Sequence, residues 1–377
     1  MSAQTPSIRE DLIYFVSCAL NGVPADRQRA ENADLTALYK AAERHMLTAL
    51  TAQALESAGI RDEAFTQAKS KAVRKAVVFD ADQKKVQESL NAAGIWHMPL
   101  KGAVIKGLYP FLGARQMSDI DILFDPSRAQ DVRDIMLKLG FVSEGFGAGA
   151  HDVYKKAPVS NFEMHRKLFA ETVVEKIADY YENVKSRLIP DGGSSFRYHF
   201  SSDDLYVYLT CHEYKHFSNS GTGLRSLADT YVFMQKRGSS LNREYIQKEL
   251  EKLGVSEFEQ STRELALRLF GGEELAEKDR EILDYIMSSG TYGTVKNSVD
   301  HKVRALGGGT AGRIRYFLRR TFLPMDTVRS SFPLFAKVPI LLPFLPLYRL
   351  SYGLTSRRKK MKAELKALFS GSKKQGR

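Results

Sequence analysis

Apolar residues recur at every third or fourth position through much of the first 80 residues, a spacing typical of amphipathic helices. Two such segments, 7–22 (SIREDLIYFVSCALNG) and 45–59 (HMLTALTAQALESAG), end at glycine, where helices commonly stop. A third covers 77–94 (VVFDADQKKVQESLNAAG), and helical periodicity returns over 203–289. The pattern therefore predicts helical regions on both sides of a central segment.

The central segment has a different pattern, in which short apolar or alternating runs predict strands. IWHMPL is too short for a helix, and DIDILF alternates acidic and apolar residues. Three further runs, separated by glycine or proline turns, are FVSEG, HDVYKKA and VSNFEMHRKL. Helices are expected between these strands within 103–113, ended by Pro110 and Gly113, and over 126–140, beginning at Pro126 and ending at Gly140.

Together these patterns predict an α+β fold, with a small mixed β-sheet core and helical flanking regions. We expect a helical N-terminal region over 1–80, an α/β core over 81–200 and a helical C-terminal domain over 201–300. A basic, proline-rich C-terminal arm and tail is expected over 301–377.

The stretch 332–350 (FPLFAKVPILLPFLPLYRL) is apolar enough to suggest a membrane span. Four prolines and Lys337 interrupt it, and they argue against a simple spanning helix. With RRKK at 357–360, the stretch is expected to pack on the body or to lie on an anionic surface. The alternative is a solvated basic tail after a proline-rich packing arm.

The net charge of +12 is unevenly distributed along the chain. Residues 301–377 hold 18 Lys and Arg but two acidic residues, so the first 300 residues carry a net charge of −4. This mildly acidic body disfavours a generic nucleic-acid-binding core, and the sequence shows no DNA-binding module. The basic tail is a candidate for peripheral contact with an anionic membrane or another polyanion.

The remaining composition is that of an ordinary globular protein, with 43% hydrophobic residues. Cys18 and Cys211 are too few for a disulfide framework, and the polar N-terminus resembles no signal peptide. A cytoplasmic location is therefore expected, with peripheral membrane contact through the tail as an option.

Candidate chemistry begins with the acidic residues of DIDILF. Residues at i and i+2 of a strand project from the same face, so Asp119 and Asp121 project together while Ile120 and Ile122 face the core. Two adjacent carboxylates repel each other unless a cation neutralises them, and Mg²⁺ prefers carboxylate and phosphate oxygens. Taken alone, the same motif also fits a solvent-facing edge strand.

Other residues around this strand strengthen the metal interpretation. Lys101 and Gly102 lie between a predicted strand and helix, where glycine permits close backbone approach and a helix N-terminus favours an anion. Arg115 follows in the connecting loop. Downstream, Glu163 and His165 share a strand face, so Glu163 would add a third carboxylate to a site for two metal ions roughly 3.5–4 Å apart.

The segment PLKGAVIKGLYPFLGARQMSDIDILFD resembles the metal-binding core of the polymerase-β-like nucleotidyltransferase superfamily. It is most similar to the uncharacterised bacterial nucleotidyltransferases that share a KG…DID core. Carried onto this chain, the resemblance gives Gly102 the turn, Asp119 and Asp121 the paired metal ligands and Glu163 the third ligand. The turn departs from the superfamily pattern, because Ala103 stands where a second small hydroxyl residue or glycine is usual.

The resemblance implies transfer of a nucleoside monophosphate from an NTP such as ATP to an acceptor hydroxyl, with release of pyrophosphate. Mg²⁺, or alternatively Mn²⁺, would be the cofactor, and the acceptor a small molecule, a sugar derivative or a protein. Glu163 could also act as the base. Lys101, Arg115 and Ser118 are candidate phosphate contacts, with surface salt bridges as the alternative for Lys101 and Arg115.

The sequence HEYKH at 212–216 matches the zinc-protease pattern H-E-x-x-H. The extended pattern fails, because Asn219 stands in place of the required glycine and Thr222 in place of the third histidine. A zinc metallohydrolase therefore remains a lesser alternative. A catalytically inactive nucleotide-binding scaffold, acting through the basic tail, is the other.

The resemblance gives this helix a different role. Similar nucleotidyltransferases carry a histidine-bearing helix followed by a helix of the form L-R-x-L-x-D. Here these features supply His212, His216, Arg225 and Asp229 as candidate residues of a cleft wall, together with His165 from the core. The alternatives are an Arg225–Asp229 pair within one helix and histidines that are simply packed.

Overall fold

The computed structural model describes residues 6–147, 149–169, 175–193, 195–356 and 358–369. Arg357 of the RRKK segment and the tail after Phe369 lie outside the described residues. The chain divides into two units, of which the first comprises Met1–Lys215 with Gly223–Thr291. The second comprises His216–Thr222 with Tyr292–Arg377.

The first unit begins with a helical region whose helix starts follow from local capping. Ser7 and Glu10 form a capping box, and Asp26, Asp34 and Asp62 accept hydrogen bonds from backbone amides of the helices that follow them. The helices are α1 (Ile8–Asn21), α2 (Arg27–Asn32), α3 (Leu35–Arg44), α4 (Thr48–Ser57) and α5 (Glu63–Ala92).

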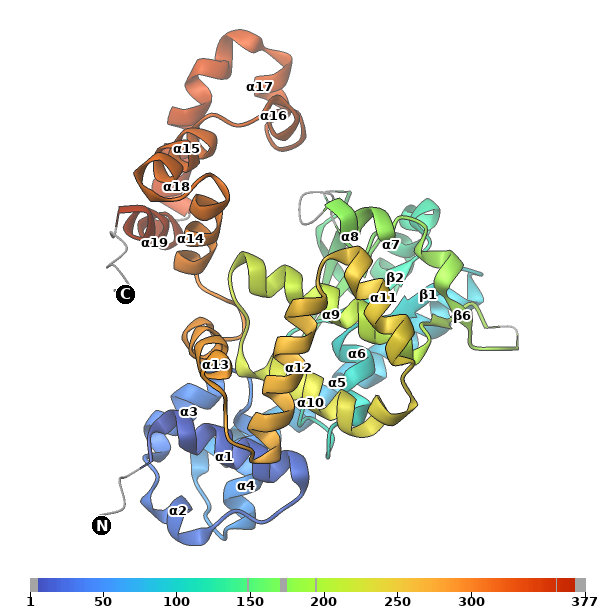
Figure 1. Cartoon of the computed structure of the whole chain (residues 1–377). Helices are drawn as coiled ribbons and strands as arrows, with labels where there is room; N and C mark the ends of the chain where they lie inside the picture. Colours follow the sequence, from blue (N-terminus) through green and yellow to red (C-terminus); the bar gives the residue numbers. More distant parts are fainter. Residues whose placement is uncertain (1–5, 148, 170–174, 194, 357, 370–377) are drawn as a thin grey trace. The chain divides into compact units, whose positions relative to one another are not determined.

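The core of the unit is a mixed sheet of strand order β1-β2-β5-β4-β3, of which β1 and β2 are labelled on the right of Figure 1. Its strands are β1 (His97–Pro99), β2 (Ile120–Phe124), β3 (Val142–Gly145), β4 (His151–Lys156) and β5 (Ser160–His165). The β2–β5 pair is parallel, and the other pairs are antiparallel. A separate antiparallel pair joins β6 (Ile189–Pro190) and β7 (Tyr198–His199).

Short helices connect these strands, and longer helices follow them. The connecting elements are α6 (Gly102–Ile105), η1 (Lys106–Leu108), η2 (Pro126–Arg128), α7 (Ala129–Lys138), α8 (Glu175–Tyr180) and η3 (Val184–Arg187). The following elements are α9 (Ser202–Asn219), α10 (Leu224–Arg237), η4 (Gly238–Ser240), α11 (Arg243–Leu253), α12 (Ser256–Gly271) and α13 (Glu277–Ser289). The predicted α+β class, a small mixed sheet with helical flanks, is confirmed.

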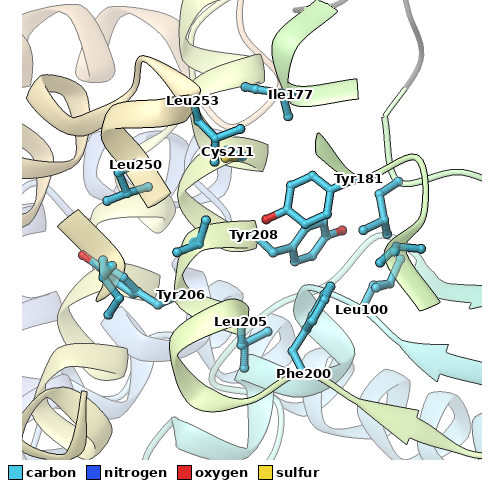
Figure 2. Close-up of a cluster of buried hydrophobic side chains, with 14 of the residues drawn as sticks. Leu100, Ile177, Tyr181, Phe200, Leu205, Tyr206, Tyr208, Cys211, Leu250 and Leu253 are labelled. Carbon is cyan, nitrogen blue, oxygen red and sulfur yellow. The ribbon is translucent and has the colours of Figure 1, made fainter. Parts of the chain in front are cut away.

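Both faces of the sheet are covered by apolar side chains. On one face Ile120 and Ile122 pack in a buried cluster with Phe79 of α5 and Met136 of α7. On the other face Leu123 joins a second buried cluster, part of which is drawn in Figure 2. Its labelled members include Ile177 of α8, Tyr208 of α9 and Leu250 of α11. Asp121 lies on this second face and is buried, so its charge depends on neighbouring side chains for stabilisation.

The helix expected within 103–113 stops just before Pro110 in the structure. It ends with η1 at Leu108, because Tyr109 adopts an extended conformation (ψ 156°) in front of Pro110, where the proline ring disfavours helical geometry. The four-part division of the chain into domains stays a prediction.

The second unit is built from short helices around a small apolar cluster of Val299, Val303, Tyr316, Ala367 and Leu368. Its elements are α14 (Val295–Ala305), α15 (Gly309–Thr321), α16 (Met325–Ser331), α17 (Pro333–Lys337), η5 (Pro339–Phe344), α18 (Leu345–Ser356) and α19 (Arg358–Phe369). Across the described part of the chain, no helix combines the length and apolar character needed to cross a membrane. The prolines of 332–350 break that stretch into α17, η5 and α18.

Gly113 has a φ of +86°, and a Cβ atom there would lie 2.8 Å from the backbone nitrogen of Val73 in α5. Gly113→Ala should therefore add a steric clash to the cost of about 1–2 kcal/mol for a left-handed alanine. Gly140→Ala is a matched control, because Gly140 has a similar φ of +84° and open space around it. Urea unfolding should show a clearly larger loss for Gly113→Ala, and equal losses would contradict the tight packing on α5.

Candidate active site

The parallel pairing of β2 with β5 fixes the centre of the site. Asp121 lies directly opposite Glu163, and Leu123 lies opposite His165. On the other side of β5, His151 of β4 lies opposite His165. Because register partners share a face of the sheet, these pairings place Asp121, Glu163, His165 and His151 on the same face.

Asp121 is buried, and its charge is held by two neighbours. Lys101 Nζ donates a hydrogen bond to Asp121 Oδ1 at 2.6 Å, and His165 Nε2 lies 2.8 Å from the same oxygen. Burial raises the pKa of Asp121, but Lys101 and His165 outweigh burial and hold that pKa well below its usual range. Asp121 is therefore ionised at neutral pH.

Glu163 is half-buried beside two histidines. His151 Nε2 and His165 Nε2 each lie 3.6 Å from Glu163 Oε2, and the imidazole centroids are 4.9 Å apart. The neighbouring His165 lowers the pKa of Glu163, and this effect outweighs burial and the nearby charge of Asp121. Burial lowers the pKa of His151, while Glu163 opposes that shift.

Potential metal ligands converge at this point. Ligand atoms of His151, Glu163 and His165 lie within 4.8 Å of one another, and among the described residues no second group of this kind is found. That group includes neither His212 nor His216 of HEYKH. His165 Nδ1 is buried and lacks a hydrogen-bond partner, so its lone pair or proton is unsatisfied.

Asp119 lies just before β2 and is influenced by both other carboxylates. Burial raises the pKa of Asp119, and the charges of Asp121 and Glu163 raise it further, while Lys101 and a hydrogen bond from Ser118 oppose them. Ser118 Oγ donates that bond to Asp119 Oδ2 at 3.1 Å. The three predicted ligands thus repel one another, which favours a cation between them.

The conformation of the Lys101–Gly102 turn depends on the packing of neighbouring side chains. Lys101 has a φ of 46°, an uncommon value for a residue with a side chain. A Cβ on Gly102 would lie 2.4 Å from Arg115 Nη1, so glycine makes room for this guanidinium. The strained backbone directs Lys101 to Asp121, which is consistent with strain at a functional site.

Arg115 forms a buried ion pair with α10. Its Nε and Nη2 donate to the two carboxylate oxygens of Asp229, each at 2.7 Å, and Tyr109 Oη donates to Asp229 Oδ1 at 2.7 Å. Burial opposes the charge of Arg115, but Asp229 outweighs burial and raises its pKa. Arg225 Nη1 donates to the carbonyl oxygen of Gln116 at 2.7 Å. Arg225 and Asp229 therefore hold the loop that leads into Asp119 and β2.

The histidine-bearing helix α9 supplies a residue that the sequence interpretation missed. Burial lowers the pKa of Lys215, Lys101 lowers it further, and Asp121 and Glu163 oppose both. Lys215 is thus electrostatically coupled to the site. The His212 ring lies 6.2 Å from the Tyr208 ring, and His216 belongs to the second unit.

Two further residues of the site were not expected from the sequence. His151 begins the strand HDVYKKA, but its neighbours follow only from the β4–β5 register. Lys75 Nζ of α5 lies 3.5 Å from the Ser118 carbonyl oxygen, and its pKa is lowered by burial against the attraction of Asp119. The position of Lys75 within its helix does not indicate that it contacts the Ser118 loop.

A family model described as an uncharacterised nucleotidyltransferase matches residues 31–271. This range contains the whole carboxylate site together with the Arg115–Asp229 pair. Searches of curated proteins and of solved structures each found no match.

We expect Lys101→Met to lower the free energy of unfolding at neutral pH by about 3–5 kcal/mol, because it leaves a buried carboxylate with one partner fewer. The depressed pKa of Asp121 stabilises the wild type above its unfolded pKa of about 4, and this stabilisation is lost as pH falls through the folded-state pKa. In the variant the pKa of Asp121 is higher, so the difference between the two proteins should shrink on acidification.

Lys155→Met is the matched control, because it breaks an exposed pair with Glu144 whose N–O distance is also 2.6 Å. Exposed pairs contribute about 0–1 kcal/mol. Urea unfolding of both variants over a range of pH measures the effect. Similar losses in the two variants would show that Lys101 does not stabilise a buried charge.

Proposed function

The chain belongs to the family of uncharacterised nucleotidyltransferases, and on that premise we propose that it transfers a nucleoside monophosphate from an NTP to an acceptor hydroxyl, releasing pyrophosphate. The observation that carries this proposal is the β2–β5 register, which sets Asp121 beside Glu163. Asp119, coupled to both by charge, supplies the third carboxylate. Phosphoryl-type transfer depends on positioning and on cations that neutralise the phosphate charge, and carboxylates can hold such cations.

The donor set fits divalent cations. Asp119, Asp121 and Glu163 would hold Mg²⁺ or Mn²⁺, and His165 adds a nitrogen donor that Mn²⁺ accepts more readily than Mg²⁺. Such cations supply charge neutralisation for the triphosphate and lower the pKa of the acceptor hydroxyl. We also propose that this site holds two metal ions, as the resemblance implies.

The chain's own groups then have separate roles. Glu163 is ionised because its pKa is lowered, and it is more exposed than Asp121. We therefore propose that Glu163 is the base that accepts the proton of the acceptor hydroxyl. Lys101 balances Asp121 in the structure, and its ammonium group is proposed to contact the triphosphate when nucleotide is bound. Ser118 and Gly102 are proposed neighbours of the phosphates.

Arg115 receives a positioning role in this proposal. Both ends of its guanidinium fork are engaged by Asp229, and its side chain is 8% exposed. Its Nε and Nη2 are committed to this pair, so we propose that Arg115, Asp229 and Arg225 hold the loop before Asp119. His212 and Lys215 are proposed residues of the cleft wall.

We propose a small molecule, a sugar derivative or a protein as the acceptor. The first 300 residues carry a net charge of −4, which does not complement a long RNA strand. An inactive nucleotide-binding scaffold is the rival interpretation, favoured by the ammonium group of Lys101 on Asp121 Oδ1. Turnover of NTP separates the two.

Asp119→Asn removes one carboxylate and leaves the Lys101 and His165 contacts of Asp121 in place, so it tests the site with little risk to the fold. We expect it to weaken metal-dependent NTP binding and pyrophosphate release by about 100-fold or more, since lost metal ligation removes several kcal/mol of charge stabilisation. Calorimetric titration of each Mg²⁺·NTP and Mn²⁺·NTP measures binding, and a pyrophosphate assay measures turnover.

Asp134→Asn is the control, because Asp134 is an exposed residue of α7 that accepts a bond from Gln130. It should behave like the wild type. Failure of the wild-type protein to bind any NTP with either metal would overturn the proposal. Binding without turnover would favour the scaffold, and unchanged binding by Asp119→Asn would place the nucleotide elsewhere.

The pH dependence of metal affinity should follow Asp119. Burial and the neighbouring carboxylates raise its pKa, so cation affinity should fall as pH decreases through that raised value. Ser118→Ala removes a hydrogen bond that lowers the pKa, and the loss of affinity should then occur at higher pH.

Electron paramagnetic resonance of Mn²⁺ without nucleotide, between about pH 4 and pH 8, follows this titration. Ser127→Ala is the matched control, because Ser127 Oγ donates to Asp125 outside the site. If Ser118→Ala leaves the pH dependence of Mn²⁺ binding unchanged, Asp119 is not the ligand whose protonation weakens metal binding.

A further inference from the structure

The segment 314–350 of the second unit, hereafter the arm, carries an unusual concentration of exposed apolar side chains. Among the described residues, 13 of the 23 exposed large hydrophobic side chains lie in this segment. They are Ile314, Phe317, Leu318, Phe322, Met325, Leu334, Val338, Ile340, Leu341, Phe344, Leu347, Tyr348 and Leu350. Exposed large apolar side chains gathered in one segment at this density are a feature of interaction sites rather than of an ordinary solvated surface.

The arm is an ordered element rather than a loose tail. Phe332, Phe335 and Tyr348 form mutual aromatic contacts, with centroid separations of 5.4–6.4 Å, which join α17 to α18. Val328 and Leu345 are buried, whereas Ile340 is 78% exposed. Helices α16 and α17 lie at the end of the second unit away from α14 and α19, which enclose its small core (Figure 1).

The charge around the arm is strongly positive. Residues 301–377 contain 18 basic residues against two acidic ones. One of these acids, Glu364, is already engaged by Arg320 and Tyr316. Exposed Arg319 and Lys337 lie in the sequence beside exposed Leu318 and Val338, so cationic and apolar side chains are neighbours in the arm.

The combination of exposed apolar side chains and positive charge favours one kind of binding partner for the arm. Two copies of the arm would bring like charges together, which opposes self-association. A nucleic acid would bind the cations but leave the aliphatic side chains in water. An anionic bilayer surface accepts both, because apolar side chains enter the interface while Lys and Arg meet the headgroups.

We propose that the arm docks on the surface of an anionic lipid bilayer, with the exposed apolar side chains of α17, η5 and α18 inserted at the interface. The prolines that divide these elements keep each of them too short to span the bilayer, so the docking is peripheral. The proposal does not depend on the nucleotidyltransferase chemistry.

Flotation of the full-length protein with vesicles tests the docking. We expect binding to phosphatidylcholine vesicles containing about 30% phosphatidylglycerol, and binding at least about tenfold weaker to phosphatidylcholine alone or at high salt. Ile340→Asp should weaken binding about tenfold or more, because insertion of one large aliphatic side chain is lost. Lys337→Glu should weaken binding by roughly tenfold through two units of charge.

Matched controls carry the same chemical changes outside the arm. Val23→Asp alters an exposed valine in the loop after α1, and Lys138→Glu reverses an exposed lysine at the end of α7. Both should bind vesicles like the wild type. Circular dichroism checks that Ile340→Asp remains folded, as expected for an exposed position.

Three outcomes would overturn the proposal. The first is no binding of the wild type to anionic vesicles. The second is equal loss in arm variants and controls. The third is a protein that does not bind vesicles but forms a dimer without lipid, detected by analytical ultracentrifugation and abolished by Ile340→Asp. That result would show that the arm contacts a second copy of the chain.

Discussion

Asp121 must remain charged beneath an apolar cluster, and much of the surrounding structure satisfies that requirement. Lys101 and His165 both contact one carboxylate oxygen, and Lys101 reaches it from a backbone with positive φ. Leu123, two residues along the same strand, packs in the buried cluster of this face. A buried ion pair adds little net stability, so such an arrangement is better understood as fixing one geometry than as strengthening the fold.

The helical flank participates directly in that geometry. Asp229 of α10 accepts three hydrogen bonds, two from Arg115 and one from Tyr109. Gly102 leaves space for the same guanidinium, so the turn before α6 and the loop before β2 are adjusted to one side chain. The carboxylate core and the helices after it therefore form one structure, although they are far apart in sequence.

The periodicity of helices and strands was sufficient to predict the α+β class. The sequence also predicted Glu163 as a third carboxylate beside Asp119 and Asp121, and the β2–β5 register sets Glu163 opposite Asp121. It could not predict that His151 lies beside Glu163, because sheet register depends on long-range pairing that a local pattern does not contain. The pairing of Arg115 with Asp229 was equally hidden. Arg225 lies four residues before Asp229 on the same helix, so the sequence offered both Arg115 and Arg225 as partners for the Asp229 carboxylate.

The Arg115–Asp229 pair links residues separated by 114 positions, which has a consequence during synthesis. At about 5–20 residues per second, a ribosome needs roughly 6–23 s to cover these 114 positions. During that time the nascent chain already contains Asp119 and Asp121, but the loop before them lacks its partner. An incomplete chain therefore cannot assemble the proposed nucleotide site, and competence would arise only after α10 has left the ribosome.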